Sequence, residues 1–179
     1  MFIDLETTGL DEKAEEIIEF AAVRVVDGAV TEEFSRLANP GRPLPLTITR
    51  LTGIADGDLR RQPASRVVLA EFLRFIGGDA VVAHNAAFEE AFLRQKSDGA
   101  FQNTTLDTLQ LCRILYPAQE HHDLDTMVFT LGLPVGERHR ALDDARVLVP
   151  LWQKLRERMD ELPFEVIATL SAMAGLTSW

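Results

Sequence analysis

Two carboxylates, Asp4 and Glu6, stand two residues apart near the end of an apolar run that begins at Phe2. At this spacing both side chains point to the same face of a β-strand. The apolar neighbours favour a central, mostly buried strand, whereas an isolated Asp-x-Glu is more often a solvated pair on an exposed strand. Because two buried carboxylates repel each other, the buried interpretation requires a cation beside them.

A second cluster, His84 to Glu90, stands where an apolar run passes into a helical pattern. Such points, at the carboxyl ends of strands, are where α/β proteins bind ligands. As an alternative, Glu89 and Glu90 are first-turn acids that interact with the helix dipole, and Phe88 belongs to the core.

A third cluster runs from His139 to Arg146. His139 stands just before a predicted helix and Asp144 about one turn into it, so both side chains can face one cleft. A His-x4-Asp pair is common by chance, and Asp143 is explained as well by an ordinary first-turn acid.

Together the three clusters supply four carboxylates and one histidine: Asp4, Glu6, Glu89, Asp144 and His139. Mg²⁺ and Mn²⁺ prefer hard oxygen ligands, and a pair of such ions activates water for in-line attack on a phosphodiester. The set therefore predicts a two-ion site for phosphodiester hydrolysis.

Short apolar runs and helical periodicities predict the elements that position these clusters. Strands are expected at 2–5, 17–26, 29–38, 80–83 and 104–106, with a hairpin at Asp27-Gly28. Helical segments are expected at 47–54, 65–76, 86–95, 108–115, 124–131, 141–158 and 162–179, with a kink at Pro150. Three antiparallel strands followed by strands separated by helices predict an α/β fold, in which helices cover both faces of a mixed sheet.

Composition and charge restrict the partners. Hydrophobic residues make up 46% and charged residues 26% of the chain, as in folded globular domains. The net charge of −10 means that any polyanion must be held by a local surface and not by bulk charge. One cysteine, Cys112, no long apolar run and no signal-peptide pattern at the N-terminus predict a cytoplasmic protein without membrane contact.

The ordered clusters resemble the three motifs of the DEDDh 3′-to-5′ exonucleases, the family of the proofreading epsilon subunit and ribonuclease T. The similar segments are Asp4-Leu5-Glu6-Thr7-Thr8-Gly9, His84 to Glu89, His139 to Asp144, and a further family segment at Ile48 to Ile54. The likeness covers residues 1–158 of the chain. It implies a ribonuclease H-like fold with a mixed five-stranded sheet whose first three strands are antiparallel.

The resemblance also divides the chain. It implies an exonuclease domain at residues 1–160 and leaves 161–179 as a helical extension or a connector to a missing domain. From Glu161-Leu162-Pro163 onward the sequence is similar to the connector that follows the exonuclease domain in bacterial DinG-type helicase fusions. An excised domain is therefore one interpretation of the chain.

In the family that the motifs resemble, Asp4 would bridge both metal ions, while Glu6 and Asp144 would hold the ion that carries the attacking water. Glu89 would support the second ion, which stabilises the leaving 3′-oxygen, and His139 would be the general base. The family usually has Asp at the position of Glu89. The added methylene is either absorbed by moving a water molecule or misplaces the ion.

Residues beside the motifs are candidates for holding the terminal nucleotide: Thr7, Thr8, Leu10, Asn85 and Phe88. The Phe88 ring could stack on or wedge between the last bases. Asn85 is expected first to hold the strand-to-helix turn by a side-chain hydrogen bond and second to touch substrate. Arg140 and Arg146 are either phosphate contacts or solvated surface residues, and His121 and His122 are expected to be loop residues.

The resemblance implies a metal-dependent 3′-to-5′ exonuclease that acts on single-stranded DNA 3′ ends. Polymerase or helicase domains, of the same or another chain, are the candidate partners. Two alternatives stay open: an exoribonuclease of the same family, since the residues do not show whether a 2′-hydroxyl is required, and a weakened-site module that binds nucleic acid or a partner. Glu89 is the sequence support for the second alternative.

Overall fold

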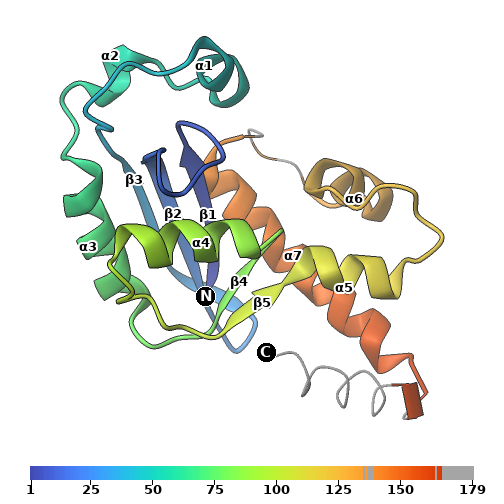
Figure 1. The fold of residues 1–179 in the computed structure, drawn as a ribbon. Helices are drawn as coiled ribbons and strands as arrows, with labels where there is room; N and C mark the ends of the chain where they lie inside the picture. The colour runs from blue at the N-terminus through green and yellow to red at the C-terminus, as the bar shows by residue number, and fades with distance from the viewer. Residues whose placement is uncertain (135, 137–138, 164, 167–179) are drawn as a thin grey trace.

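The computed structural model describes residues 1–134, 136, 139–163 and 165–166, and it shows a five-stranded sheet flanked by helices (Figure 1). The spatial order of the strands is β3-β2-β1-β4-β5. The strands are β1 (Phe2–Thr7), β2 (Ile17–Val26), β3 (Ala29–Leu37), β4 (Val81–Ala83) and β5 (Thr105–Asp107).

The sheet is mixed, as predicted. β1 and β3 each pair antiparallel with β2, while β4 pairs parallel with both β1 and β5. The β2–β3 hairpin turns at Asp27 and Gly28, whose φ angles of 51° and 81° are those that a type I′ turn requires. Because β1, β4 and β5 run in one direction, their carboxyl ends meet at the same edge of the sheet, called here the carboxyl edge.

Helices cover both faces of the sheet, so the predicted α/β architecture with a mixed five-stranded sheet is confirmed. Side chains of α5, α6 and α7 form the core on one face, and side chains of α3 and α4 form the core on the other. The helices are α1 (Leu46–Thr52), α2 (Asp56–Leu59), α3 (Ser65–Ile76), α4 (Ala87–Lys96), α5 (Thr108–Leu115), α6 (Leu124–Leu131) and α7 (Ala141–Asp160).

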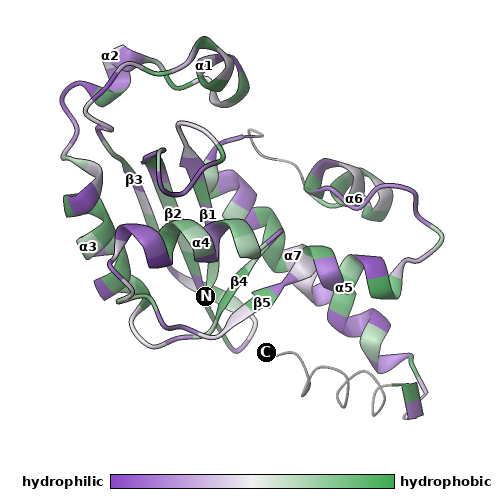
Figure 2. Ribbon diagram, viewed as in Figure 1, coloured by the Kyte–Doolittle hydropathy of each residue, from purple (hydrophilic) through white to green (hydrophobic). Residues whose placement is uncertain are grey.

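The alternation of side chains along β1 decides where its carboxylates point. Ile3 and Leu5 are buried in the core with α3 and α4, whereas Phe2 is buried in the core with α7. Asp4 and Glu6 therefore lie on the α7 face, as their spacing predicts. The central strands carry mostly hydrophobic residues (Figure 2), which makes these two acids exceptions within a buried strand.

The structure differs from the prediction by one short helix and at the ends of several elements. The short helix is α2, which was not predicted because four residues are too few to show a helical period. It is held by the buried Leu59 and by a hydrogen bond from the Ala55 amide to the Asp58 carboxylate (2.9 Å). α7 runs on to Asp160 with Pro150 inside it, and the kink stays a prediction. Most of the predicted helix at 162–179 lies outside the described residues.

Over the part of the chain that the structure describes, no helix combines the length and the apolar character that a membrane span needs. The division into residues 1–160 and 161–179 stays a prediction.

Candidate active site

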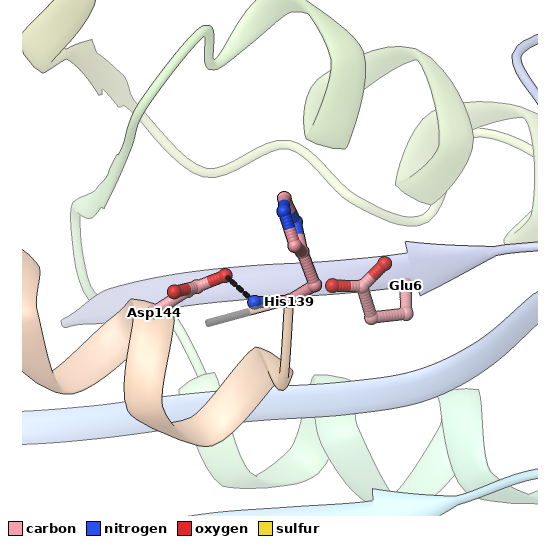
Figure 3. A group of neighbouring side chains, drawn as sticks. All are labelled: Glu6, His139 and Asp144. Carbon is pink, nitrogen blue, oxygen red and sulfur yellow. Dashed lines mark hydrogen bonds between the residues drawn. The ribbon is translucent and has the colours of Figure 1, made fainter. Parts of the chain in front are cut away.

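Three predicted site residues from distant parts of the chain come together at the carboxyl edge. One ligand atom from each of Glu6, His139 and Asp144 lies within 4.8 Å of the other two. Glu6 comes from β1, His139 lies two residues before α7, and Asp144 lies in the first turn of α7 (Figure 3). Figure 3 shows the Glu6 carboxylate beside His139, with the imidazole pointing away from the α7 backbone.

The start of α7 is built to hold this geometry. The backbone N–H of His139 donates to Oδ2 of Asp144 (3.1 Å), and the Asp144 N–H donates to the carbonyl of Arg140 (3.0 Å). His139 has a left-handed backbone with φ of 59°, a conformation that is uncommon for non-glycine residues but enriched in His. The buried Asp144 carboxylate thus fixes the residue that carries the imidazole.

A residue that the sequence analysis missed, Glu19, supports this side of the site. Glu19 lies directly opposite Glu6 in the β1–β2 register, so both carboxylates project from the same face. Its buried side chain accepts bonds from Nε (3.3 Å) and Nη2 (3.0 Å) of Arg140 and from the Ala141 amide (3.1 Å). The sequence signal that could have identified Glu19 is its position as the one acid inside the apolar run of β2.

We call Glu6, His139, Asp144 and the Glu19–Arg140 pair the His139 side of the site. The guanidinium of Arg140 offsets the charge of Glu19, which would otherwise face Glu6 across two neighbouring strands. Arg140 is therefore engaged by protein. So is Arg146, which pairs with Glu33 (2.7 Å) and Asp143 (3.0 Å).

The other side of the site contains Glu89 in the first turn of α4 and Asp107 at the end of β5, and we call it the Glu89 side. Glu89 is 4% exposed, and its Oε2 has no hydrogen-bond partner among the residues that the structure describes. Burial, reinforced by the negative charges of Asp107 and Glu6, raises the pKa of Glu89 from 4.5 to about 8. The next acid, Glu90, pairs instead with Arg94 (2.8 Å).

Asp107, which the sequence analysis also missed, ties two turns of the carboxyl edge together. Its Oδ1 accepts from the Leu109 amide (2.8 Å), which caps α5, and from the Asn85 amide (3.0 Å), which closes the turn between β4 and α4. Asp followed by a helical run is the usual sequence signal of an N-cap. The bond that holds the turn thus comes from the Asn85 backbone, and not from its side chain as expected.

The donor set fits a divalent cation. Its carboxylate oxygens are the ligands that Mg²⁺ and Mn²⁺ prefer, and a buried acid beside two like charges would gain from such an ion. Asp4 lies half-buried on the same face of β1 as Glu6. Asp4 and Glu89 stand outside the tight group of three.

The predicted nucleotide contacts occupy different positions. Thr7, the last residue of β1, and Thr8, which follows it, are buried. Thr7 Oγ1 donates to the Gly9 carbonyl (2.6 Å), and the Thr8 hydroxyl bonds to Glu15. Leu10 is 85% exposed. The Phe88 ring is half-buried with its centroid 4.8 Å from that of Phe92. Their contacts with substrate stay predictions.

Two histidines outside the cluster, His84 and His122, make structural hydrogen bonds, and His121 is an exposed loop residue as predicted. His122 lies in the loop between α5 and α6, as predicted, and its carbonyl accepts a bond from His84 Nε2 (2.8 Å). The other ring nitrogen of His84 lies 3.0 Å from the Thr108 hydroxyl. His84 therefore connects the end of β4 to α5 and to this loop.

A mixed sheet that carries carboxylates and a histidine at its carboxyl edge is the arrangement expected for the ribonuclease H-like fold class. Residues 1–151 match the family model described as Exonuclease (RNase_T), so the chain belongs to this exonuclease family of hydrolytic nucleases. The motif resemblance is thereby confirmed.

Relatives of the chain include replication proteins. It is 42% identical over 159 residues to a DNA polymerase III PolC-type of Halalkalibacterium halodurans, covering 86% of this chain but 11% of that protein. It is 38% identical over 161 residues to the DNA polymerase III subunit epsilon of Aquifex aeolicus, covering 88% of this chain and 80% of that protein. The chain thus spans only a small part of the PolC-type relatives.

Solved structures give the same fold. Exonuclease X in complex with 5′ overhanging duplex DNA superposes with a TM-score of 0.70 at 26% identity, covering 87% of this chain and 89% of that one. E. coli Exonuclease I in complex with a dT13 oligonucleotide superposes with a TM-score of 0.78 at 17% identity, covering 89% of this chain and 41% of that one. At the second identity the likeness concerns the fold alone.

Proposed function

We propose that the chain is a metal-dependent 3′-to-5′ exonuclease that shortens single-stranded DNA from its 3′ end and releases nucleoside 5′-monophosphates. The observation that carries this proposal is the meeting of Glu6, His139 and Asp144 within 4.8 Å at the carboxyl edge. Membership of the exonuclease family and the relative named as a polymerase subunit epsilon support it.

His139 is the proposed general base. A neutral imidazole accepts a proton readily near neutral pH, and a ring nitrogen of His139 would take it from the attacking water. The bond from the His139 amide to Asp144 fixes the residue that carries the ring. Loss of the proton makes the water a nucleophile for the terminal phosphodiester.

Asp4, Glu6, Asp144 and Glu89 are the residues that would hold two Mg²⁺ or Mn²⁺ ions. When bound, these ions would lower the pKa of water and stabilise charge on the leaving 3′-oxygen. The unsatisfied buried oxygen of Glu89 supports a cation on that side of the site. The finer assignments, two ions and four ligands, belong to this proposal.

The test uses 5′-labelled and 3′-labelled single-stranded DNA with Mg²⁺, Mn²⁺ or EDTA. We expect the 5′ label to give a ladder of shortened strands and the 3′ label to appear at once as a mononucleotide, with neither product in EDTA. Asp144→Asn should lower the rate by about 10³-fold or more, because a lost ligand removes several kcal/mol of transition-state stabilisation.

Asp143→Asn is the matched control, since Asp143 is the adjacent acid on α7 and pairs with Arg146. Its rate should stay close to that of the unchanged protein. Equal rates for the Asp144 and Asp143 variants would refute the site assignment.

The same assay with RNA of equal sequence tests the exoribonuclease alternative. Binding of either strand without any metal-dependent product would instead identify a weakened-site module. A cytoplasmic location and association with polymerase or helicase domains belong to this proposal as well. The polymerase part is supported by relatives in which the similar segment is a small part of a DNA polymerase III PolC-type.

A further inference from the structure

The charge of the chain is unevenly distributed. The segment 42–66, which joins β3 to α3 through α1 and α2, holds five arginines and two aspartates, while the rest of the chain carries a net charge of −13. We call 42–66 the arginine segment. A segment with a net charge of +3 in so acidic a protein is a local surface of the kind that a polyanion requires.

Most of these arginines are not used within the fold. Arg50, Arg60, Arg61 and Arg66 are exposed and make no ion pair with any residue that the structure describes. The two acids of the segment serve its backbone instead: Asp56 accepts from the Leu44 amide (2.8 Å) and Asp58 from the Ala55 amide (2.9 Å). The four guanidinium groups therefore face solvent with their charge unmatched by a direct partner.

Five arginines elsewhere in the chain behave differently. Side chains at 24, 94, 140, 146 and 158 are all held by carboxylates of the protein. Arg42, the first residue of the arginine segment, pairs with Glu15. Arginines at 36, 74, 113 and 156 are also exposed and make no ion pair with described residues, but they are spread over β3, α3, α5 and α7, whereas four such arginines fall within residues 50–66.

The arginine segment lies near the candidate active site. α1 and α2 are at the same end of the molecule as the carboxyl end of β1 (Figure 1). Nη2 of Arg42 donates to the Thr8 hydroxyl (2.7 Å), and Thr8 is two residues beyond Glu6. The segment therefore begins at the turn that borders the carboxylate cluster.

The segment is also held firmly. A small core of Ile18, Leu44, Ile54 and Leu59 attaches it to β2 beside Glu19, and prolines at 43, 45 and 63 restrict its backbone. An ordered surface loses little conformational entropy on binding. Guanidinium groups on such a surface are well suited to phosphate, which they bind through paired N–H donors.

We propose that the arginine segment binds the phosphodiester backbone of the substrate strand upstream of its 3′ end. The inference rests on the proposed function, which identifies the bound strand as single-stranded DNA. It adds to that function the protein surface that binds the strand. The carboxylate cluster would act on the terminal phosphodiester, while the arginines would supply the affinity that the acidic remainder of the chain opposes.

The test compares two triple variants that change the net charge equally. Arg50→Gln/Arg60→Gln/Arg61→Gln removes charge from the arginine segment, and Arg74→Gln/Arg113→Gln/Arg156→Gln removes it from exposed positions on α3, α5 and α7 that likewise make no ion pair with described residues. Binding of a 5′-labelled single-stranded DNA is measured by fluorescence anisotropy in EDTA over a series of salt concentrations, so that the result does not depend on hydrolysis.

We expect the segment variant to bind DNA about tenfold more weakly at low salt. The plot of log association constant against log salt concentration should become shallower by about 2, since each of the three lost phosphate contacts on a single strand contributes about 0.7. The control variant should keep both values. Equal binding by the two variants, or no binding by the unchanged protein, would overturn the proposal. Equal binding would instead favour an acidic protein partner as the ligand of the arginine segment.

Hydrolysis of the p-nitrophenyl ester of thymidine 5′-monophosphate separates this proposal from the proposed function. This diester has no upstream backbone, so the segment variant should hydrolyse it with unchanged kcat and KM while its KM for long single-stranded DNA rises. If the unchanged protein does not hydrolyse this ester, the result counts against the exonuclease activity alone. The anisotropy comparison would still test whether the arginine segment binds DNA.

Discussion

On the His139 side of the site, the Glu19 carboxylate is bound by the Arg140 guanidinium and the Ala141 amide. On the Glu89 side, by contrast, the charges that act on Glu89 are those of Asp107 and Glu6, both negative. The first side is compensated by the protein itself. On the second side, burial and the two negative charges raise the pKa of Glu89 to about 8. A cation bound at Glu89 would supply the positive charge that Arg140 supplies to Glu19 on the first side.

The difference has a structural cause. α7 begins beside β1, and Arg140 immediately precedes it, four residues before the site residue Asp144. α4 begins with Ala86 and Ala87 and places its arginine, Arg94, two turns further on, where it pairs with Glu90. The four predictions below test the two sides in turn.

The largest effect is expected from His139. His139→Asn removes the proposed base but suits the positive φ of 59°, because Asn tolerates the left-handed conformation better than Ala. We expect single-turnover rates to fall by about 10²- to 10⁴-fold at neutral pH. Mn²⁺ affinity, measured by electron paramagnetic resonance, should stay unchanged; an equal fall in affinity would make His139 a metal ligand.

The next effect is on stability and concerns the Glu19–Arg140 pair. Arg140→Gln leaves a buried Glu19 carboxylate opposite Glu6, and we expect a loss of about 2 kcal/mol in the free energy of unfolding, less than for a fully buried pair because Arg140 is 36% exposed. Adding Glu19→Gln to the Arg140→Gln variant should recover most of the lost free energy of unfolding. Urea denaturation of the single and double variants measures this coupling.

The matched control for that cycle is the Glu90–Arg94 pair on α4. It is exposed and spaced i to i+4, so its coupling free energy should be about 0.5 kcal/mol or less. Additive effects of the Glu19 and Arg140 substitutions would contradict the view that the His139 side is compensated by this pair.

Parts of this arrangement follow from local sequence and parts do not. The strand period places Asp4 and Glu6 on one face, and the helical period finds α3, α5 and α6 with their observed ends. Glu19 and Arg140 are 121 residues apart, and the register that sets Glu19 opposite Glu6 is not visible in either segment alone. Asp107 is a recognisable cap, but its bond to Asn85 depends on β4 and β5 being neighbours.

The third prediction concerns the protonation of Glu89 in metal-free protein. Its pKa is raised in the folded chain, so between pH 4.5 and about 8 unfolding releases a proton from Glu89 and stability falls as pH rises. Glu89→Gln does not titrate. We expect the variant to gain more than about 1 kcal/mol relative to the unchanged protein between pH 5 and pH 8 in EDTA, since each pKa unit corresponds to about 1.4 kcal/mol.

Glu90→Gln is the control, because Glu90 is paired with Arg94 at the surface and its difference from the unchanged protein should vary little with pH. Addition of Mg²⁺ at pH 8 should stabilise the unchanged protein more than Glu89→Gln, since metal binding favours the ionised acid. A pH-independent difference for Glu89→Gln would show that its carboxyl group is ionised without the help of a cation.

The smallest effect is expected from shortening the same side chain. Glu89→Asp restores the residue that the exonuclease motif usually has, and it moves the carboxylate back by one methylene. Mg²⁺ requires near-ideal octahedral geometry, whereas Mn²⁺ is expected to accept a looser one, so the variant should gain a few-fold in Mg²⁺-supported turnover and less with Mn²⁺. Because the proposed role of the second ion is at the leaving oxygen, the gain should appear in kcat more than in KM. Single-turnover rates over a series of Mg²⁺ concentrations measure it, and no gain at any concentration would mean that the buried Glu89 already serves as an effective ligand, with the surrounding Glu89 side adapted to its length.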